Sequence, residues 1–283
     1  MNKLINLLRF DRDLLITPNI SLINRISFII RKYYAVAFNK RRISYLGRKF
    51  IYDGKFSPVA MQMYPLEISF LDKKINFKKI RSILDIGSNI GQFSFTIKSF
   101  YPQISCYCFE PNSKIFPLLE KNTSYFSNMH LFNYGIGKKE KRAFYFAPSS
   151  SGLGSFYEKN VHQFGNKKDV EEIQIKCIEL SKKTLKNLNL PKNFDLIKID
   201  VEGAEIEVLK SLKNVDCKYL FIEISVNREG KTEIEGIKKI IRQYLKKNPI
   251  LLASKRLSNK SPSIDCLFKL ENLTLNNFKY KSY

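Results

Sequence analysis

Short apolar runs, separated by polar turns and helical patterns, dominate the middle of the chain. Four of them have the length of β-strands, and they occupy residues 82–86, 106–109, 194–199 and 219–222. Most of their positions are apolar, which is typical of strands that are covered on both faces in a parallel sheet. After the first run, Phe93, Ile97 and Phe100 recur at the spacing of a helix. This order predicts an α/β fold with a doubly wound, mostly parallel sheet.

The C-terminal part of the chain predicts how this sheet ends. Apolar residues at helical spacing run through 232–247, and strand-like runs follow at 250–253 and 265–270, with a basic, serine-containing loop between them. Such an ending suits a closing helix and an antiparallel hairpin. Earlier in the chain a helix is expected over 113–121, where Pro117 should bend it or delay its start.

Residues 1–50 form a basic N-terminal extension with a pattern of its own. The apolar cluster 26–30 is followed by Arg31 and Lys32, and then by the basic run 40–42. Either this segment is a helix packed on the sheet, or it is a basic amphipathic helix that contacts a membrane surface. Its arginines interrupt any apolar run of transmembrane length, about 18 residues or more. The charged residues at 9 and 11–13 also argue against a secretory signal.

A candidate cofactor loop follows the first strand. Asp85 lies near the end of that strand, and Gly87 and Gly91 come directly before a helical pattern. Glycines let the backbone turn tightly and approach a ligand, so the loop is typical of a site for a nucleoside-bearing cofactor. Glu110, which ends the next strand and precedes Pro111, has the spacing of an acid that binds ribose hydroxyls. A dinucleotide loop would need glycines at positions 89 and 92, where asparagine and glutamine stand, so NAD is the weaker choice.

A third motif begins at Asp200, directly after the run 194–199. With this motif, the chain resembles the FkbM family of S-adenosylmethionine-dependent methyltransferases over roughly residues 64–225. The blocks that carry the resemblance, in the family's order, are Asp85-Ile86-Gly87-Ser88-Asn89-Ile90-Gly91, Phe109-Glu110-Pro111 and Ile199-Asp200-Val201-Glu202-Gly203-Ala204-Glu205. Their combination is far more specific than a single glycine motif. Ser88 stands where the family usually has alanine, and we expect little consequence because both residues are small.

The resemblance implies a class I methyltransferase fold, Rossmann-like, that binds S-adenosylmethionine. It makes 51–283 the catalytic domain, with an insertion near 138–176. The first loop is expected to hold the methionine end of the cofactor, with Asp85 and Asn89 facing its amino and carboxylate groups. The implied cofactor-binding residues are Asp85, Gly87, Ser88, Asn89, Gly91, Glu110 and Pro111. In purely structural roles, Asp85 would be a helix cap and Asn89 a left-handed turn residue.

Methyl transfer to an oxygen needs an aligned acceptor and a group that removes its proton. Asp200 is the first catalytic candidate and Glu202 the second, although the helix dipole also stabilises acids in a first helical turn. His162 is a third candidate, because it lies in a glycine-containing loop that could close over the acceptor. A solvated loop histidine is the simpler interpretation. Ser155 in the same loop and Glu223 at the end of the fifth strand are candidate substrate-binding residues.

Neither a metal centre nor a disulfide framework is expected. Asp200, Glu202 and Glu223 could together hold a hard cation such as magnesium, but they lack the spacing of a known metal loop. The cysteines are Cys106, Cys108, Cys177, Cys217 and Cys266. This odd set, without C-x-x-C spacing and mostly in apolar runs, predicts reduced core residues and a cytoplasmic protein.

The net charge of +23 indicates a polyanionic partner, such as nucleic acid, anionic lipid or a phosphate-linked glycan, without choosing among them. RNA methylation and a non-catalytic nucleic-acid-binding module on the same fold are therefore the alternatives. The Asp-Val-Glu-Gly motif differs from the Asn-Pro-Pro-Tyr type that methylates flipped bases.

As the resemblance implies, we expect O-methyl transfer to a sugar hydroxyl of a surface glycan or glycoconjugate, lipid- or nucleotide-linked. The N-terminal extension could bring the enzyme to the inner face of a membrane; the sugar and the oligomeric state stay open.

Overall fold

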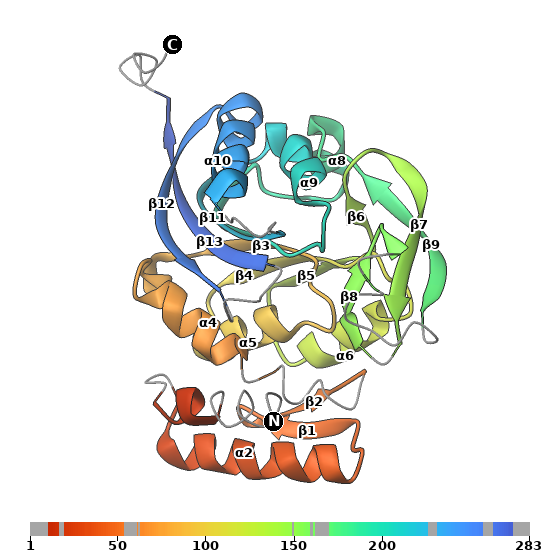
Figure 1. Cartoon of the computed structure of the whole chain (residues 1–283), viewed down its shortest axis with the longest axis vertical. Helices are drawn as coiled ribbons and strands as arrows, with labels where there is room; N and C mark the ends of the chain where they lie inside the picture. Colours follow the sequence, from red (N-terminus) through yellow and green to blue (C-terminus); the bar gives the residue numbers. More distant parts are fainter. Residues whose placement is uncertain are drawn as a thin grey trace.

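The computed structural model describes residues 11–16, 20–53, 61, 63–148, 150–158, 161, 170–225, 231–256 and 263–273. A seven-stranded sheet of spatial order β12-β13-β11-β10-β3-β4-β5 forms its centre (Figure 1). Its strands are β3 Ser82–Ile86, β4 Ser105–Phe109, β5 Met129–Phe132, β10 Asn193–Ile199, β11 Asp216–Ser225, β12 Lys247–Lys255 and β13 Ser263–Asn272. Five neighbouring strands run parallel to one another, namely β5, β4, β3, β10 and β11. Strand β13 is antiparallel to both of its neighbours, β11 and β12. The predicted doubly wound sheet with a C-terminal antiparallel hairpin is confirmed.

The register of the parallel strands brings three strand ends together. Ile86, the last residue of β3, pairs with the last residues of both β4 and β10. The residues that follow these ends are Gly87, Glu110 and Asp200, and they therefore lie at one edge of the sheet. Backbone hydrogen bonds continue past the ends, since the N–H of Asp200 donates to the carbonyl of Ile86 at 3.0 Å. In open α/β sheets this carboxyl edge is where ligands bind.

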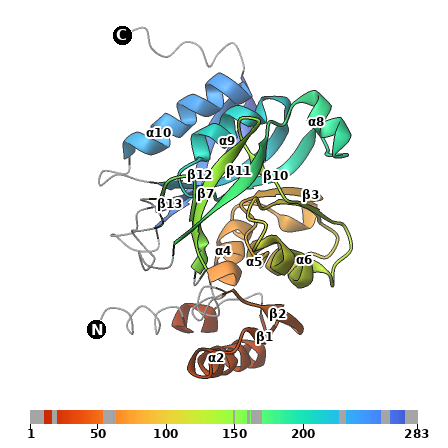
Figure 2. The same ribbon diagram turned by 90° about the vertical axis from the view of Figure 1, so that its right-hand side faces the viewer.

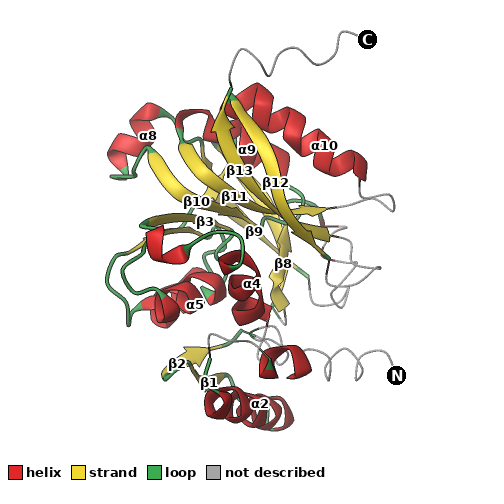
Figure 3. Ribbon diagram, turned by 90° about the vertical axis from the view of Figure 1, so that its left-hand side faces the viewer, coloured by secondary structure: helices red, strands yellow, loops and turns green. Residues whose placement is uncertain are grey.

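Helices cover both faces of the sheet (Figure 3). On one face lie α4 Met63–Asp72, α5 Gln92–Phe100 and α6 Phe116–Thr123, and on the other α8 Lys182–Asn187, α9 Glu205–Ser211 and α10 Lys231–Ile240. Two apolar cores result, because successive residues of a strand point to opposite faces. Ile83 of β3 packs in the core under α4 and α5, and its neighbour Leu84 packs in the core under α9 and α10.

Several boundaries differ from the sequence patterns. The helix expected over 113–121 begins only at Phe116, so Pro117 lies in its first turn, where a missing N–H costs nothing. The closing helix expected over 232–247 is α10 followed by a π-helical turn, Ile241–Leu245. Short 3₁₀ turns lie at Phe77–Lys79 and Leu212–Asn214. All five cysteines are buried and free, as predicted for reduced core residues.

A second, four-stranded sheet lies beside the carboxyl edge of the first. It has the order β6-β9-β7-β8, with β6 Gly135–Ile136, β7 Glu140–Ala147, β8 Ser150–Ser155 and β9 Glu171–Ile178. This sheet includes most of the segment expected as an insertion, and β8 occupies part of the loop that contains Ser155. The Glu207 carboxylate of α9 anchors the sheet, because it accepts hydrogen bonds from the Lys138 N–H at 2.9 Å and from Arg142 at 2.7 Å.

The N-terminal segment forms a layer of its own (Figure 2). Helix α2, Leu22–Ala37, packs on the hairpin of β1 Arg42–Tyr45 and β2 Arg48–Ile51, and the hairpin core continues into Phe95 of α5. The sequence led us to expect a helix that packs on the sheet. That expectation is wrong, because the helix packs on the hairpin, and α4, α5 and α6 lie between this N-terminal layer and the sheet. Asn122 of α6 ties the layer in place through bonds with the N–H and carbonyl of Ile51. No helix in the described part of the chain is long and apolar enough to cross a membrane.

Candidate active site

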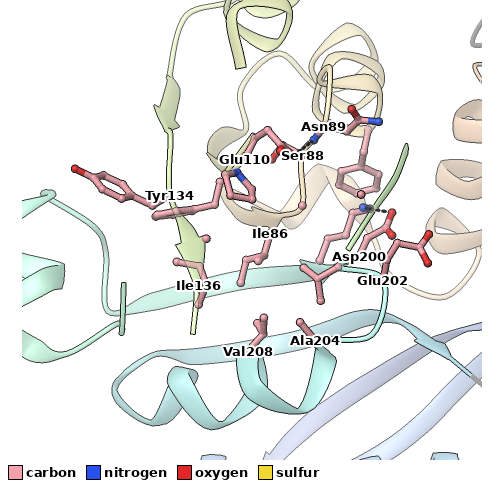
Figure 4. A pocket seen from close by; sticks show the side chains of 18 of the residues that line it. Ile86, Ser88, Asn89, Glu110, Tyr134, Ile136, Asp200, Glu202, Ala204 and Val208 are labelled. Atoms are coloured by element: carbon pink, nitrogen blue, oxygen red, sulfur yellow. Dashed lines mark hydrogen bonds and ion pairs between the residues drawn. The ribbon is translucent and has the colours of Figure 1, made fainter. Parts of the chain in front are cut away.

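A cavity opens at the carboxyl edge of the sheet, where the strand ends meet (Figure 4). Strand-end residues and aromatic side chains make up most of its lining. The strand ends contribute Gly87, Ser88, Asn89, Glu110, Pro111, Lys198, Asp200 and Glu202. Aromatic side chains contribute Tyr64, Phe93, Phe109, Tyr134, Phe144 and Phe156. Figure 4 shows Tyr134 and Ile136 at the opposite end of the cavity from Asp200 and Glu202, so the cavity has an apolar end and an acidic end.

The loop after β3 is held by the neighbouring strands. The N–H groups of Gly87 and Ser88 both donate to the carbonyl of Phe109 at 3.0 Å. Gly87 has φ +84°, and a Cβ there would collide with the backbone carbonyl of Asp200. Asn89 adopts the left-handed backbone conformation at φ 49°, as expected for a turn residue. Glycine at 87 is therefore required by the close approach of β10, a contact within the protein itself.

Gly91 does not line the cavity. It precedes the first residue of α5 at φ +89°, and a Cβ there would come within 2.9 Å of the Leu119 side chain. This glycine thus lets α5 start close to α6, and its predicted role in cofactor binding stays a prediction.

Glu110 connects the two loops at the cavity floor. One carboxylate oxygen accepts from the N–H of Asn89 and the other from the N–H of Asn112, both at 2.8 Å. Burial raises the pKa of Glu110 to about 7, although these two N–H groups act in the opposite direction. An ionised carboxylate has about four acceptor positions, so two are left for hydroxyl donors such as those of a ribose. Asn133 supports the turn by donating to the carbonyl of Glu110 at 2.8 Å.

Asp85 is fully buried, and its carboxylate does not line the cavity. One oxygen accepts from the hydroxyl of Ser94 at 2.6 Å, and the other lies 3.9 Å from the ammonium nitrogen of Lys198. Asp85 and Lys198 are direct neighbours in the register of β3 and β10, which places both side chains on the same face of the sheet. The carboxylate therefore lies beneath the loop, where it is a charge partner of Lys198, and its predicted contact with the cofactor stays a prediction.

Lys198 is the most consequential residue that the sequence analysis overlooked. Its side chain is 4% exposed, and its ammonium group donates to Asp200 at 2.9 Å. Burial raises the pKa of Asp200, but the Lys198 charge and hydrogen bond outweigh it and hold that pKa below its usual value. A lysine in the middle of an apolar strand was a visible signal, because a buried lysine needs a carboxylate partner.

Three carboxyl groups meet at the acidic end of the cavity. Oxygens of Asp200, Glu202 and Glu223 all lie within 4.8 Å of one another. Burial and the Asp200 charge raise the pKa of Glu202 to about 8, and the same causes raise the pKa of Glu223 well above its usual value. Glu67 of α4, which the sequence motifs did not include, has its pKa raised to about 8 by burial. At neutral pH the cluster therefore combines ionised Asp200 with neighbouring acids that hold their protons; the prediction that no metal binds here stays a prediction.

The second sheet forms the roof of the cavity. Phe144 of β7 and Phe156, just after β8, line it, and the guanidinium of Arg142 lies 3.9 Å from the Phe156 ring centroid. Ser155 is 1% exposed, and its hydroxyl donates to the backbone carbonyl of Glu202 at 2.7 Å. Its side chain thus holds the roof against the Glu202 loop, and its predicted contact with substrate stays a prediction. His162 lies outside the described residues.

Comparisons with known proteins found a matching family model, similar proteins and similar solved structures. The model of the methyltransferase FkbM domain matches residues 85–248. Methyltransferase 1 of Beauveria bassiana (strain ARSEF 2860) is 29% identical over 180 residues, which cover 56% of this chain and 72% of that protein. Methyltransferase sdnD of Sordaria araneosa is 30% identical over 154 residues, 46% of this chain and 60% of that protein. Among solved structures, the fibrillarin pre-rRNA processing protein of Methanococcus jannaschii is 12% identical, with a TM-score of 0.45 over 70% of each chain.

Proposed function

Because the chain belongs to the FkbM family of methyltransferases, we propose that it transfers the methyl group of S-adenosylmethionine to a hydroxyl oxygen of a sugar in a glycan or glycoconjugate. The supporting observation is the carboxyl cluster of Asp200, Glu202 and Glu223. Its members Asp200 and Glu202 line one end of the cavity that Glu110 and the loop 87–89 also line.

The residues present fit the cofactor. Glu110 keeps free acceptor positions at the cavity floor for the ribose hydroxyls, and the loop 87–89 would hold the methionine end. Tyr134 and Ile136 offer an apolar surface at the other end, suited to a planar base. When bound, S-adenosylmethionine supplies an electrophilic methyl group, which bonds to the acceptor oxygen as its bond to sulfur breaks.

Asp200 is suited to receive the proton that the acceptor hydroxyl loses. It is the carboxylate that Lys198 keeps ionised, so it can accept a hydrogen bond from the hydroxyl and orient the oxygen for in-line attack. Glu202 and Glu223 hold protons at neutral pH, so each can donate one hydrogen bond as well as accept others. A cluster that both donates and accepts suits an acceptor with several adjacent hydroxyls, which is the chemistry of a sugar.

An acceptor screen with isotopically methyl-labelled S-adenosylmethionine tests the proposal. The panel should include free glycans, nucleotide-linked sugars, lipid-linked glycans and RNA, with mass spectrometry to locate the methyl group. We expect label on a sugar oxygen. Transfer to RNA but to none of the sugars, or to a nitrogen atom, would contradict the proposal and favour the alternative acceptor.

Asp195 in β10 and Asp200 directly after it provide a matched pair of variants for the role of the base. Asp200→Asn should lower kcat by roughly 10²–10⁴-fold, the usual contribution of general base catalysis, while binding of S-adenosylmethionine persists. Asp195→Asn changes a residue at the other end of the strand, where Asp195 accepts from the N–H of Arg81 at 2.7 Å. This control should keep kcat near the wild-type value. Equal activity of the two variants would exclude Asp200 as the base.

A further inference from the structure

Helix α2 has two apolar faces, and only one of them is used inside the protein. The inner face carries Phe28, Lys32 and Ala35, which are buried. Phe28 packs against the Tyr45 ring of the hairpin with a centroid separation of 5.1 Å, and Lys32 forms a buried ion pair with Asp11. The inner face therefore accounts for the docking of α2 on the protein.

The opposite face of α2 is apolar and exposed to solvent. Its exposed residues are Leu22 54%, Ile23 79%, Ile26 44%, Ile30 65%, Tyr33 38% and Tyr34 54%, followed by Phe38 63%. We call these seven residues the outer face. They recur at helical spacing, so they form a continuous stripe about half a turn away from the buried residues. A helix that packs on a protein along one face normally carries polar residues on the other, and a contiguous exposed apolar patch marks an interaction site.

Basic residues surround the outer face. Helical geometry places the exposed Arg31 on one flank of the stripe, and the exposed run 40–42 follows directly after the helix. Arg25, on the other flank, donates a hydrogen bond to the carbonyl of Leu15. From residue 11 to residue 53 the sequence has nine Lys and Arg, three Asp and no Glu. An apolar stripe between basic side chains is the composition of a helix that lies in the interface of an anionic membrane. The apolar side chains enter the acyl boundary while the cations meet lipid phosphates.

We propose that the outer face of α2 docks the protein on an anionic phospholipid surface, with the helix lying in the plane of that surface. The helix is the outermost layer of the described chain in all three views (Figures 1, 2 and 3), and the exposed fractions of its outer face show that the hairpin does not cover it. A flat bilayer can therefore reach the whole stripe. Charge argues against a second copy of this chain as the partner, because pairing two outer faces would bring two strongly basic layers together. This proposal does not depend on the identity of the methyl acceptor.

A single tryptophan reporter tests the proposal directly, because the chain has no tryptophan of its own. Ile30→Trp places the reporter on the outer face, and Ile206→Trp places it at a 50% exposed position of α9, on the far side of the sheet. We expect vesicles of phosphatidylcholine with phosphatidylglycerol to shift the emission of Ile30→Trp to shorter wavelength. Vesicles of phosphatidylcholine alone should shift it much less, and Ile206→Trp should not respond to either. A shift of the same size in both variants, or in neither, would overturn the proposal.

Co-sedimentation with the same vesicles provides a second test on the full chain. The double variant Ile23→Glu with Ile30→Glu should lose most of its binding to the anionic vesicles, whereas Ile206→Glu should retain it. Both positions of the double variant are exposed, so its thermal unfolding should match that of the wild type. If the double variant binds the anionic vesicles as well as the wild type does, the binding comes from the overall positive charge of the protein and not from the outer face, and the proposal fails. It also fails if the wild type binds no vesicle but forms a dimer, by light scattering, that the double variant loses.

Discussion

Replacing Glu110 with alanine should weaken binding of S-adenosylmethionine by tenfold or more, which corresponds to about 1.4 kcal/mol. The Glu110 carboxylate accepts two backbone N–H groups at 2.8 Å, from the two loops that form the cavity floor. Hydrogen bonds to a charged group contribute about 1.5–3 kcal/mol each. Losing those two bonds should reduce the order of the loops and the stability of the protein. Losing the acceptor positions for the ribose should weaken binding of the cofactor. One lost ribose bond is sufficient for the tenfold effect.

The pKa of Glu110 adds a pH dependence to the same prediction. Burial raises this pKa to about 7 in the protein without cofactor, and the ionised form is the one that accepts from both loops and from the ribose. Affinity should therefore increase as pH rises through that value. Glu110→Gln should bind weakly at every pH and remove this rise, because an amide does not titrate.

Isothermal titration calorimetry at several pH values measures both effects, with thermal unfolding to show that each variant is folded. Glu120→Ala, at an exposed position of α6, is the matched control and should bind as the wild type does. If Glu110→Ala is too unstable to titrate, the Glu110→Gln variant decides. Wild-type affinity in a folded Glu110 variant would refute the assignment of this residue to the cofactor.

Three other predictions concern stability. Lys198→Met should reduce the free energy of unfolding by about 3–5 kcal/mol, because it leaves buried carboxylates without their cation; urea unfolding at neutral pH measures the loss, and a change under about 1 kcal/mol would contradict the buried ion pair. Gly87→Ala should prevent normal folding or strongly lower Tm, since its methyl group collides with the carbonyl of Asp200. Burial raises the pKa of Glu67 to about 8, so the folded protein keeps a proton that the unfolded chain releases near pH 4 to 5. The stability that this retained proton gives the folded state is therefore fully present at low pH and is lost as pH rises through about 8. Consequently, Glu67→Gln should gain stability over the wild type on going from about pH 5 to about pH 8, whereas the exposed control Glu235→Gln should not; equal pH profiles would show that Glu67 titrates normally.

Much of the cofactor half of the site could be predicted from the sequence, because its determinants are local. Each strand end carries its own candidate site residue, and parallel strands present those ends at one edge. Gly87, Glu110 and Asp200 were therefore identified without knowledge of the register. The family resemblance, which rests on the same three blocks, is confirmed by the match over residues 85–248.

Other features depend on contacts between distant parts of the chain. Asp85 was expected at the cofactor, and only its place beside Lys198 in the register of β3 and β10 shows that it is a charge partner of a buried lysine. Glu67 is close enough to Lys198 and Asp200 for their charges to affect its pKa, and it comes from a helix that carries no recognised motif. Phe156 reaches the cavity because Arg142 and the pairing of β7 with β8 hold it there.

By itself, the sequence determined the order of strands and helices, the family and the residues at each strand end, because these follow from short-range pattern and spacing. Tertiary structure decided which carboxyl group is ionised, since a pKa depends on burial and on the charges that packing brings near. It likewise decided that α2 is covered on one side by the hairpin and exposed on the other. A helix with apolar residues on two faces does not specify in its sequence which face the protein covers.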